Sequence, residues 1–146
     1  MNERELEARY DILLDRYSRN IQIESRILGE MALNQIVPAA IEAQNKLIHH
    51  LQQLQSTGIS EGVEELRITV EKNARHIKEV KKQVYEMIQE RKAANNTEST
   101  KAMANAYCKQ VKPYFDSIRY HIEKLELNID DQLWPVPKYR ELLFMR

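Results

Sequence analysis

Residues 63–87 read VEELRITVEKNARHIKEVKKQVYEM, and the spacing of their apolar side chains decides the fold class of this chain. Apolar positions recur at alternating steps of three and four residues, which is typical of a heptad seam along an α-helix. The seam consists of Val63, Leu66, Val70, Asn73, Ile77, Val80, Val84 and Met87. Asn73 is its one polar member. Because a buried Asn side chain needs a hydrogen-bond partner, we expect Asn73 to favour one helix register over slipped ones.

A second apolar stripe precedes this seam, and a proline interrupts its pattern. The stripe consists of Leu6, Tyr10, Leu13, Leu14, Tyr17, Ile21, Leu28 and Met31. Asn2 and Glu5, just before it, have the spacing of a capping box. Pro38 removes one amide donor and clashes with the carbonyl of Asn34, at a cost of about 3 kcal/mol unless the helix bends or ends. Since helical spacing resumes directly after Pro38, the pattern predicts one long kinked helix, with two separate helices as the alternative.

The third helical stretch begins near residue 100 and also contains a proline. Its seam consists of Ala104, Cys108, Val111, Phe115, Ile118, Ile122, Leu125 and Ile129. Pro113 lies inside this seam and predicts a second kink. Cys108, as a member of the seam, is expected to be a buried thiol that packs as a small hydrophobic side chain.

Two short polar breaks divide the three stretches, at residues 56–62 and 95–100. The first break holds two glycines, and Asn95 with Glu98 in the second has the spacing of another capping box. Short connections between long helices imply antiparallel neighbours. We therefore predict an all-α fold, an antiparallel bundle of three long helices. The part of the first helix after Pro38 is expected to project beyond the other two helices or to fold over them.

The last stretch of the chain, LWPVPKYRELLFMR at residues 133–146, differs from the rest. It holds the only Trp, one of the two Phe and two of the four Pro. Termini usually fray unless they are tied down, so we expect a docking tail that belongs to the same domain as the bundle of residues 1–132. The tail either closes its own bundle or forms a subunit or domain interface. The expected interface residues are Trp134, Pro135, Pro137, Tyr139, Leu142, Leu143 and Phe144, while Asn73, Pro38 and Pro113 are expected to set the shape of the bundle.

The charge and the cysteine content argue against several classes of function. The chain holds 22 Lys and Arg against 22 Asp and Glu, so its net charge is zero and no long-range field steers it to nucleic acid. No apolar run approaches the roughly 20 residues of a membrane span. The single cysteine and an N-terminus without a secretory signal predict a reducing, cytoplasmic setting.

Patterns typical of catalysis, cofactor binding or metal binding are missing from the sequence. His49 and His50 are adjacent and therefore point about 100° apart on a helix. No Glu precedes a His by three residues, and the three glycines do not cluster as a phosphate-binding loop requires. We therefore predict no catalytic, cofactor-binding or metal-binding residue in this chain.

Residues 131–144, DQLWPVPKYRELLF, resemble the C-terminal end of type III glutamine synthetases, the large bacterial form. The opening of the chain, through residues 7–14, 21–26 and 39–41, resembles the C-terminal helical region of the same family. So do residues 112–121, KPYFDSIRYH. The resemblance covers almost the whole chain in the same order, and from about residue 52 to residue 104 only the helical character matches.

This resemblance implies a parent enzyme that joins ammonia to glutamate at the expense of ATP, with divalent metal, in a large ring-shaped oligomer. It also implies that ATP, metal and glutamate are bound by catalytic domains upstream, so no functional residue carries over to this chain. The expected function is a non-catalytic structural and assembly domain that packs against the upstream catalytic domain and neighbouring subunits of a homo-oligomer.

A second class of function stays open on the sequence. A free-standing coiled-coil adaptor would bind a partner helix along an incompletely paired apolar stripe, which we place on the second half of the first helix. A catalytic domain encoded just upstream of Met1 would decide for the assembly domain.

Overall fold

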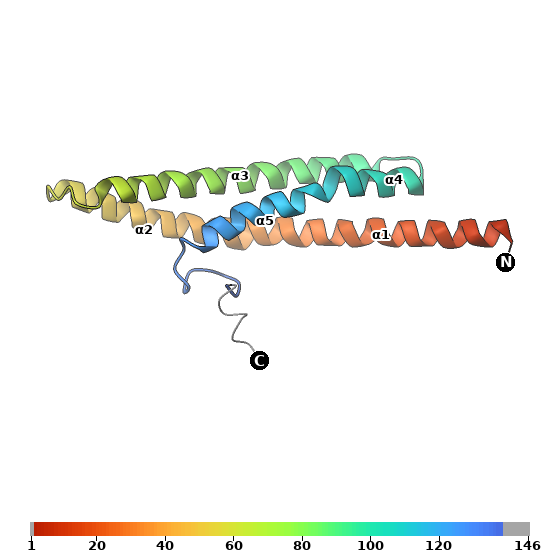
Figure 1. Ribbon diagram of the computed structural model, residues 1–146, viewed down its shortest axis with the longest axis horizontal. Helices are drawn as coiled ribbons and strands as arrows, with labels where there is room; N and C mark the ends of the chain where they lie inside the picture. The colour runs from red at the N-terminus through yellow and green to blue at the C-terminus, as the bar shows by residue number, and fades with distance from the viewer. Residues whose placement is uncertain (1, 139–146) are drawn as a thin grey trace. The chain divides into compact units, whose positions relative to one another are not determined.

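The computed structural model describes residues 2–138, and every regular element in this range is helical (Figure 1). The elements in chain order are α1 (Glu3–Met31), the π-helical η1 (Ala32–Ile36), α2 (Val37–Ser56), α3 (Val63–Asn95), α4 (Thr100–Ala106), the π-helical η2 (Tyr107–Val111) and α5 (Pro113–Glu126). They form three long helical stretches separated by the two predicted breaks. The all-α prediction with three long helices is therefore confirmed.

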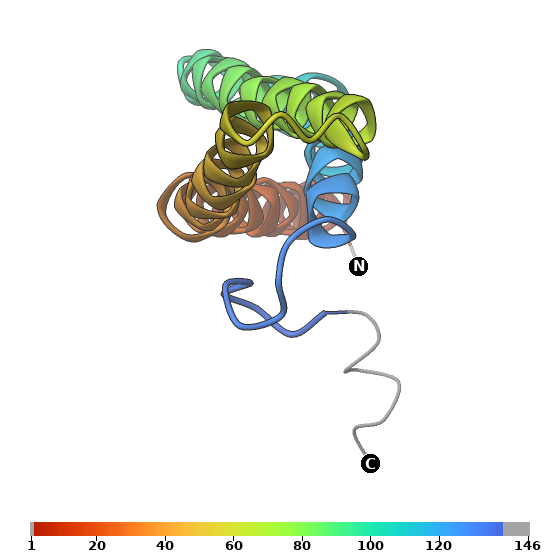
Figure 2. The same ribbon diagram turned by 90° about the vertical axis from the view of Figure 1, so that its left-hand side faces the viewer.

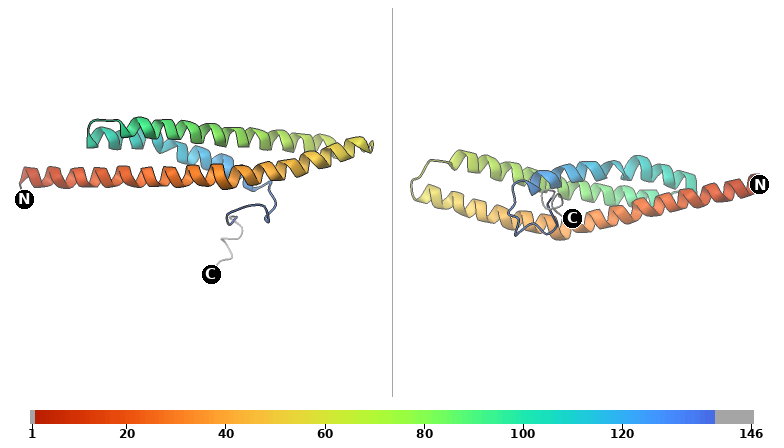
Figure 3. Two further views of the ribbon diagram at one scale, coloured as in Figure 1. Left: turned by 180° about the vertical axis from the view of Figure 1, so that it is seen from behind. Right: turned by 60° about the horizontal axis from the view of Figure 1, so that its bottom comes forward.

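The chain divides into two compact units. Unit 1 contains residues up to Glu30 together with residues 82–118, and unit 2 contains residues 31–81 together with the chain from Arg119 onward. In unit 1, α4 turns back beside the end of α3 after a short connection (Figure 3). In unit 2, α2 and the first half of α3 lie side by side, joined by residues 57–62 (Figure 2). Gly58 and Gly62 in this connection have φ of 72° and 78°, which only glycine adopts freely.

Both prolines follow a π-helical segment at the same distance. Each segment begins six residues before its proline and ends two residues before it. The amide of Val37 donates to the carbonyl of Ala32, and the amide of Lys112 donates to the carbonyl of Tyr107, so each wide turn closes over five residues. The extra residue accommodates the prolines inside helical backbone that never breaks into a loop. Pro38 therefore lies in the first turn of α2, and the helical stretch continues through it.

The π-helical segment η2 shifts the seam of the third helical stretch. Cys108 was expected on that seam, but it is exposed, and the residue before it, Tyr107, is 1% exposed. The extra residue of η2 rotates the helix, so that the buried positions before Pro113 become Ala104, Tyr107 and Val111. The prediction of a buried thiol is therefore wrong, because it assumed α-helical periodicity throughout.

The heptad seam of α3 is on the buried side. Its second half, Val80, Val84 and Met87, is fully buried, and Asn73 is 3% exposed. In unit 1, a Cβ on Gly29 of α1 would lie 3.4 Å from Val84 Cγ1, which is close but ordinary contact. Gly29 therefore lies where α1 comes close to the apolar seam of α3 in unit 1.

Of the two predicted capping boxes, the structure contains the first and not the second. At the start of α1 the amide of Glu5 donates to Asn2 Oδ1 at 2.9 Å and Glu5 Oε2 accepts from the Asn2 amide at 3.4 Å, which confirms the first capping box. At the start of α4 the cap is Ser99, whose Oγ accepts from the amide of Ala102. The prediction for Asn95 is wrong, since α3 continues to this residue and its Oδ1 accepts from the Tyr107 hydroxyl at 2.5 Å.

The uncovered part of the first helical stretch is its beginning. Every residue from Asn2 to Leu13 is exposed, and within unit 1 this part of α1 extends past the connection of α3 to α4 (Figure 1). By contrast, α2 contains buried residues, among them Ala40 and Ala43, beside the first half of α3. The alternative in which the part after Pro38 projects is therefore wrong, because α2 is partly buried. The alternative in which this part folds over the other helices stays a prediction.

Candidate interface sites

A compact loop follows α5 in unit 2. Asp130 organises its first turn: its Oδ1 accepts from the amide of Gln132 at 2.9 Å, and its carbonyl accepts from the amide of Trp134 at 3.0 Å. An Asp side chain that bonds the backbone two residues on stabilises a tight turn. The turn thereby fixes the backbone of Trp134 relative to Asp130.

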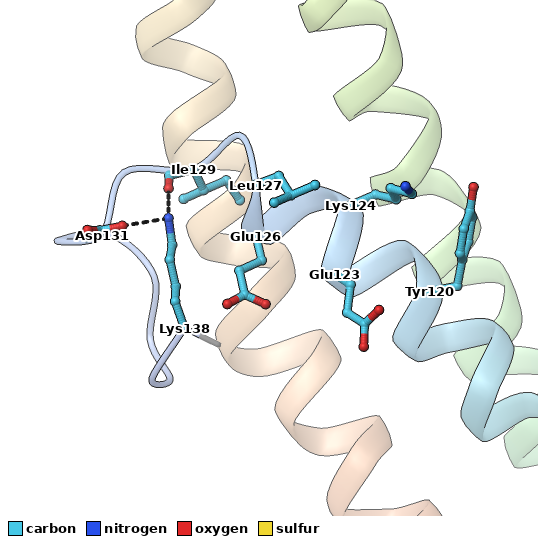
Figure 4. Close-up of a pocket in the computed structure, with 8 residues that line it drawn as sticks. All are labelled: Tyr120, Glu123, Lys124, Glu126, Leu127, Ile129, Asp131 and Lys138. Atoms are coloured by element: carbon cyan, nitrogen blue, oxygen red, sulfur yellow. Dashed lines mark hydrogen bonds and ion pairs between the residues drawn. The ribbon is translucent and has the colours of Figure 1, made fainter. Parts of the chain in front are cut away.

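Lys138 closes the same loop. Its ammonium group forms an ion pair with Asp131 at 2.8 Å and donates to the carbonyl of Ile129, and its side chain is only 12% exposed (Figure 4). A cation that is largely withdrawn from water needs such partners. The two contacts therefore hold the end of the described chain against the beginning of the loop.

An open pocket of about 830 Å³ lies between the end of α5 and this loop (Figure 4). Its lining combines three acidic and two basic side chains with one Tyr and two aliphatic residues: Tyr120, Glu123, Lys124, Glu126, Leu127, Ile129, Asp131 and Lys138. Leu127 is 78% exposed. Lys, Glu and Asp are depleted at the centres of protein–protein interfaces, so the charged lining does not by itself mark this pocket as a contact surface.

Trp134 is buried, with 6% of its surface exposed. Its indole Nε1 is also buried and has no acceptor among the described residues. Buried indole donors usually have a partner. Trp134 thus buries a large apolar side chain in unit 2, while its indole N–H has no acceptor among the described residues.

Asn73 on α3 has a partner close to the beginning of the loop. Asn128 Nδ2 donates to Asn73 Oδ1 at 3.2 Å, and both residues belong to unit 2. A second polar contact lies about one turn earlier on α3, where Gln44 of α2 donates to the carbonyl of Val70 at 2.6 Å. These bonds tie α2 and the segment after α5 to defined positions on α3.

We expect Asn73→Leu to change helix register or oligomeric state more than it lowers stability. Leucine restores an apolar seam, and the exposed Asn128 can turn to water, so the free energy of unfolding should change by less than about 1 kcal/mol. Light-scattering mass and hydrogen exchange of α3 measure the effect. Asn105→Leu, at an exposed helical position, is the control. Unchanged mass and exchange in the Asn73 variant would show that Asn73 has no specifying role.

Two histidines meet in unit 2, His76 from α3 and His121 from α5. Their Nδ1 atoms lie 2.9 Å apart, so one imidazole donates and the other accepts. The Tyr120 ring packs edge-on against both imidazoles. Burial lowers the pKa of His76, and the nearby positive charges of His121, Arg75 and Lys124 lower it further. His76 is therefore less readily protonated than a histidine in water.

This arrangement predicts that stability decreases as pH falls. The unfolded chain protonates His76 near pH 6.5, whereas the folded chain does so only at lower pH. Between these values the unfolded state binds more protons, so the melting temperature should drop below pH 6.5 and level off once the folded His76 is protonated. His76→Phe should flatten this part of the profile, while His49→Phe, at an exposed position of α2, should not. Equal slopes in both variants would remove His76 as the cause.

The predicted interface residues lie in different settings. Trp134 and Asn73 are buried, whereas Pro135, Pro137, Pro38 and Pro113 are exposed. Tyr139, Leu142, Leu143 and Phe144 lie outside the described residues. Sequence reasoning missed four contributors: Tyr107, Asn128, the His76–His121 pair and the Lys138–Asp131 ion pair. Tyr107 stands six residues before Pro113, and this spacing could have indicated it. The other three contributors depend on contacts between segments far apart in the sequence or across a loop.

Residues 2–138 contain no group of three or more His, Cys, Asp or Glu side chains placed to hold a metal ion. Within the same range, no helix combines the length and apolar character needed to cross a bilayer.

Comparisons with known proteins point to one family. The family model described as glutamine synthetase C-terminal domain matches residues 1–55. A glutamine synthetase of Bacteroides fragilis is 41% identical over 99% of this chain, and a type-3 glutamine synthetase of Dictyostelium discoideum is 28% identical over 97% of it. The chain spans about a fifth, 20%, of the length of each of these curated relatives and matches their C-terminal part.

Proposed function

The chain belongs to the family of glutamine synthetase C-terminal domains, and on this premise we propose that it is a non-catalytic assembly domain of a type III enzyme. The observation that carries the proposal is the match of nearly the whole chain to the C-terminal fifth of its relatives. The parent reaction would be the ATP-dependent ligation of ammonia to glutamate. ATP and divalent metal would be bound by the part of the protein that precedes this domain.

The contacts within each unit support an architectural role for the domain. Gln44 of α2 bonds Val70 of α3, Tyr107 of η2 bonds Asn95 of α3, and Asn128, after α5, bonds Asn73 of α3. We propose that the three helical stretches form an antiparallel bundle, with the wide turns before Pro38 and Pro113 setting its shape. Bundles of this type present long surfaces to neighbouring domains.

The C-terminal tail is the proposed closing element of the domain. Trp134 is buried, and Lys138 fastens the loop through Asp131 and Ile129. We propose that the bundle of residues 1–132 and the tail of residues 133–146 form one domain. Tyr139, Leu142, Leu143 and Phe144 would extend the contact, either on the same chain or on a neighbouring subunit of a ring-shaped homo-oligomer in the cytoplasm.

The B. fragilis relative provides the test. A version that lacks its C-terminal fifth should lose oligomer mass in light scattering, and a chimera that carries this chain instead should recover it. Clean 146-residue chain should neither hydrolyse ATP nor form glutamine. A truncated relative with full mass and turnover would refute the assembly role, and turnover by the 146-residue chain would refute the non-catalytic one.

The adaptor alternative rests on one observation, the exposed stripe at the beginning of α1. An adaptor would use this stripe rather than the second half of the helical stretch, where α2 is partly buried. Pull-down of a partner by the isolated chain, lost on changing Tyr10 to Asp, would favour it over the assembly domain.

A further inference from the structure

The apolar stripe at the beginning of α1 has an exposed part that is followed by a buried part. Leu6, Tyr10 and Leu13 are 57%, 54% and 62% exposed, at helical spacings of four and three residues. The same stripe continues through Tyr17 to Ile21, which is 5% exposed. One continuous apolar face is therefore covered by unit 1 at its end and left open at its beginning.

No side chain of residues 3–13 is buried, so nothing in unit 1 covers this segment. The segment continues into the packed part of α1, so helix propagation from that part and the capping box at Asn2 support its helical form. Leu6, Tyr10 and Leu13 nevertheless leave an apolar face in water, and a surface that covers this face would be favoured by the hydrophobic effect.

We propose that residues 3–13 of α1 are the docking segment of this domain. Through them the domain would pack on the catalytic region of the longer protein to which it would belong. This inference rests on the proposed function, since the relatives place about four-fifths of their length outside the part shared with this chain, and the shared part is C-terminal. The catalytic region would then connect directly to the beginning of α1. Tethering raises its effective concentration, so a small contact is sufficient.

The size of the segment argues against a second copy as the occupant. Eleven residues of helix span about 16 Å, and one face about 10 Å wide offers roughly 160 Å². A stable complex between free partners buries about 800 Å² on each side. The stripe is therefore too small for free association and fits a partner held in place by the chain itself.

The test uses the chimera of the B. fragilis enzyme with this chain. Leu6→Asp with Leu13→Asp should cost the chimera its oligomer mass or its activity, while the melting of the isolated 146-residue chain stays unchanged because both residues are exposed. Ala8→Asp with Ile12→Asp is the matched control, since both are exposed apolar residues on a different face of the same segment. The control should leave the chimera intact.

Cross-linking shows which part of the protein covers Leu6, Tyr10 and Leu13. Benzoylphenylalanine in place of Tyr10 should cross-link within one chain to a peptide of the catalytic region. A cross-link to α1 of a second copy would overturn the proposal, as would equal damage by the control pair. If removal of the whole domain disrupts the enzyme but Leu6→Asp with Leu13→Asp does not, the docking segment is wrong and the assembly role stands. If removal of the whole domain has no effect, the assembly role itself is wrong.

Discussion

Trp134→Ala is expected to lower the free energy of unfolding by about 3–5 kcal/mol, the range for truncating a large buried aromatic side chain. Trp134 is 6% exposed, and the loop that carries it is fastened by Asp130 and Lys138. Removing the indole leaves a cavity that this fastened loop cannot easily close. Thermal melting by circular dichroism and urea titration measure the loss.

Two companion variants make this result specific. Trp134→Phe keeps most of the apolar volume and removes the indole Nε1 that has no partner among the described residues, so it should cost much less. Leu127→Ala lies in the same loop at 78% exposure and should change stability by less than about 0.5 kcal/mol. Because Trp134 is the only Trp, its fluorescence reports directly on burial. Equal melting of Trp134→Ala and Leu127→Ala, with unchanged oligomer mass, would refute the docked tail.

Tyr107→Ala is expected to have an effect of similar size, about 3–5 kcal/mol, although the α-helical pattern assigns the buried position to its neighbour. Tyr107 is 1% exposed and donates to Asn95 Oδ1 at 2.5 Å. Burial raises the pKa of its hydroxyl, which keeps the group a neutral donor. Tyr107→Phe, which loses only the hydrogen bond, should cost about 1 kcal/mol.

Cys108→Ala is the decisive control for the wide turn. Cys108 is exposed, with a contact to the Tyr17 hydroxyl that raises the pKa of that Tyr. Its replacement should cost less than about 1 kcal/mol. The reverse order, a costly Cys108→Ala and a mild Tyr107→Ala, would mean that the third helical stretch keeps α-helical register and that η2 is wrong.

The local features of the fold were accessible from the sequence. Apolar spacing along α3 identified its buried side, including Asn73, because helical periodicity is a property of a few consecutive turns. Glycine and polar clusters predicted breaks at residues 56–62 and 95–100 for the same reason, and the structure has them at residues 57–62 and 96–99. The unusual composition of the last stretch singled out Trp134 before any contact was known.

Tertiary structure decided what no local pattern contains. The wide turn before Pro113 places Tyr107 inside and Cys108 outside, because a proline can be accommodated by a bend, an end or an inserted residue, and the surrounding packing selects among them. Which part of the α1 stripe is covered depends on how far α3 and α4 extend beside it. The His76–His121 pair and the Asn73–Asn128 bond join residues 45 and 55 positions apart, and only folding brings such groups within reach of one another.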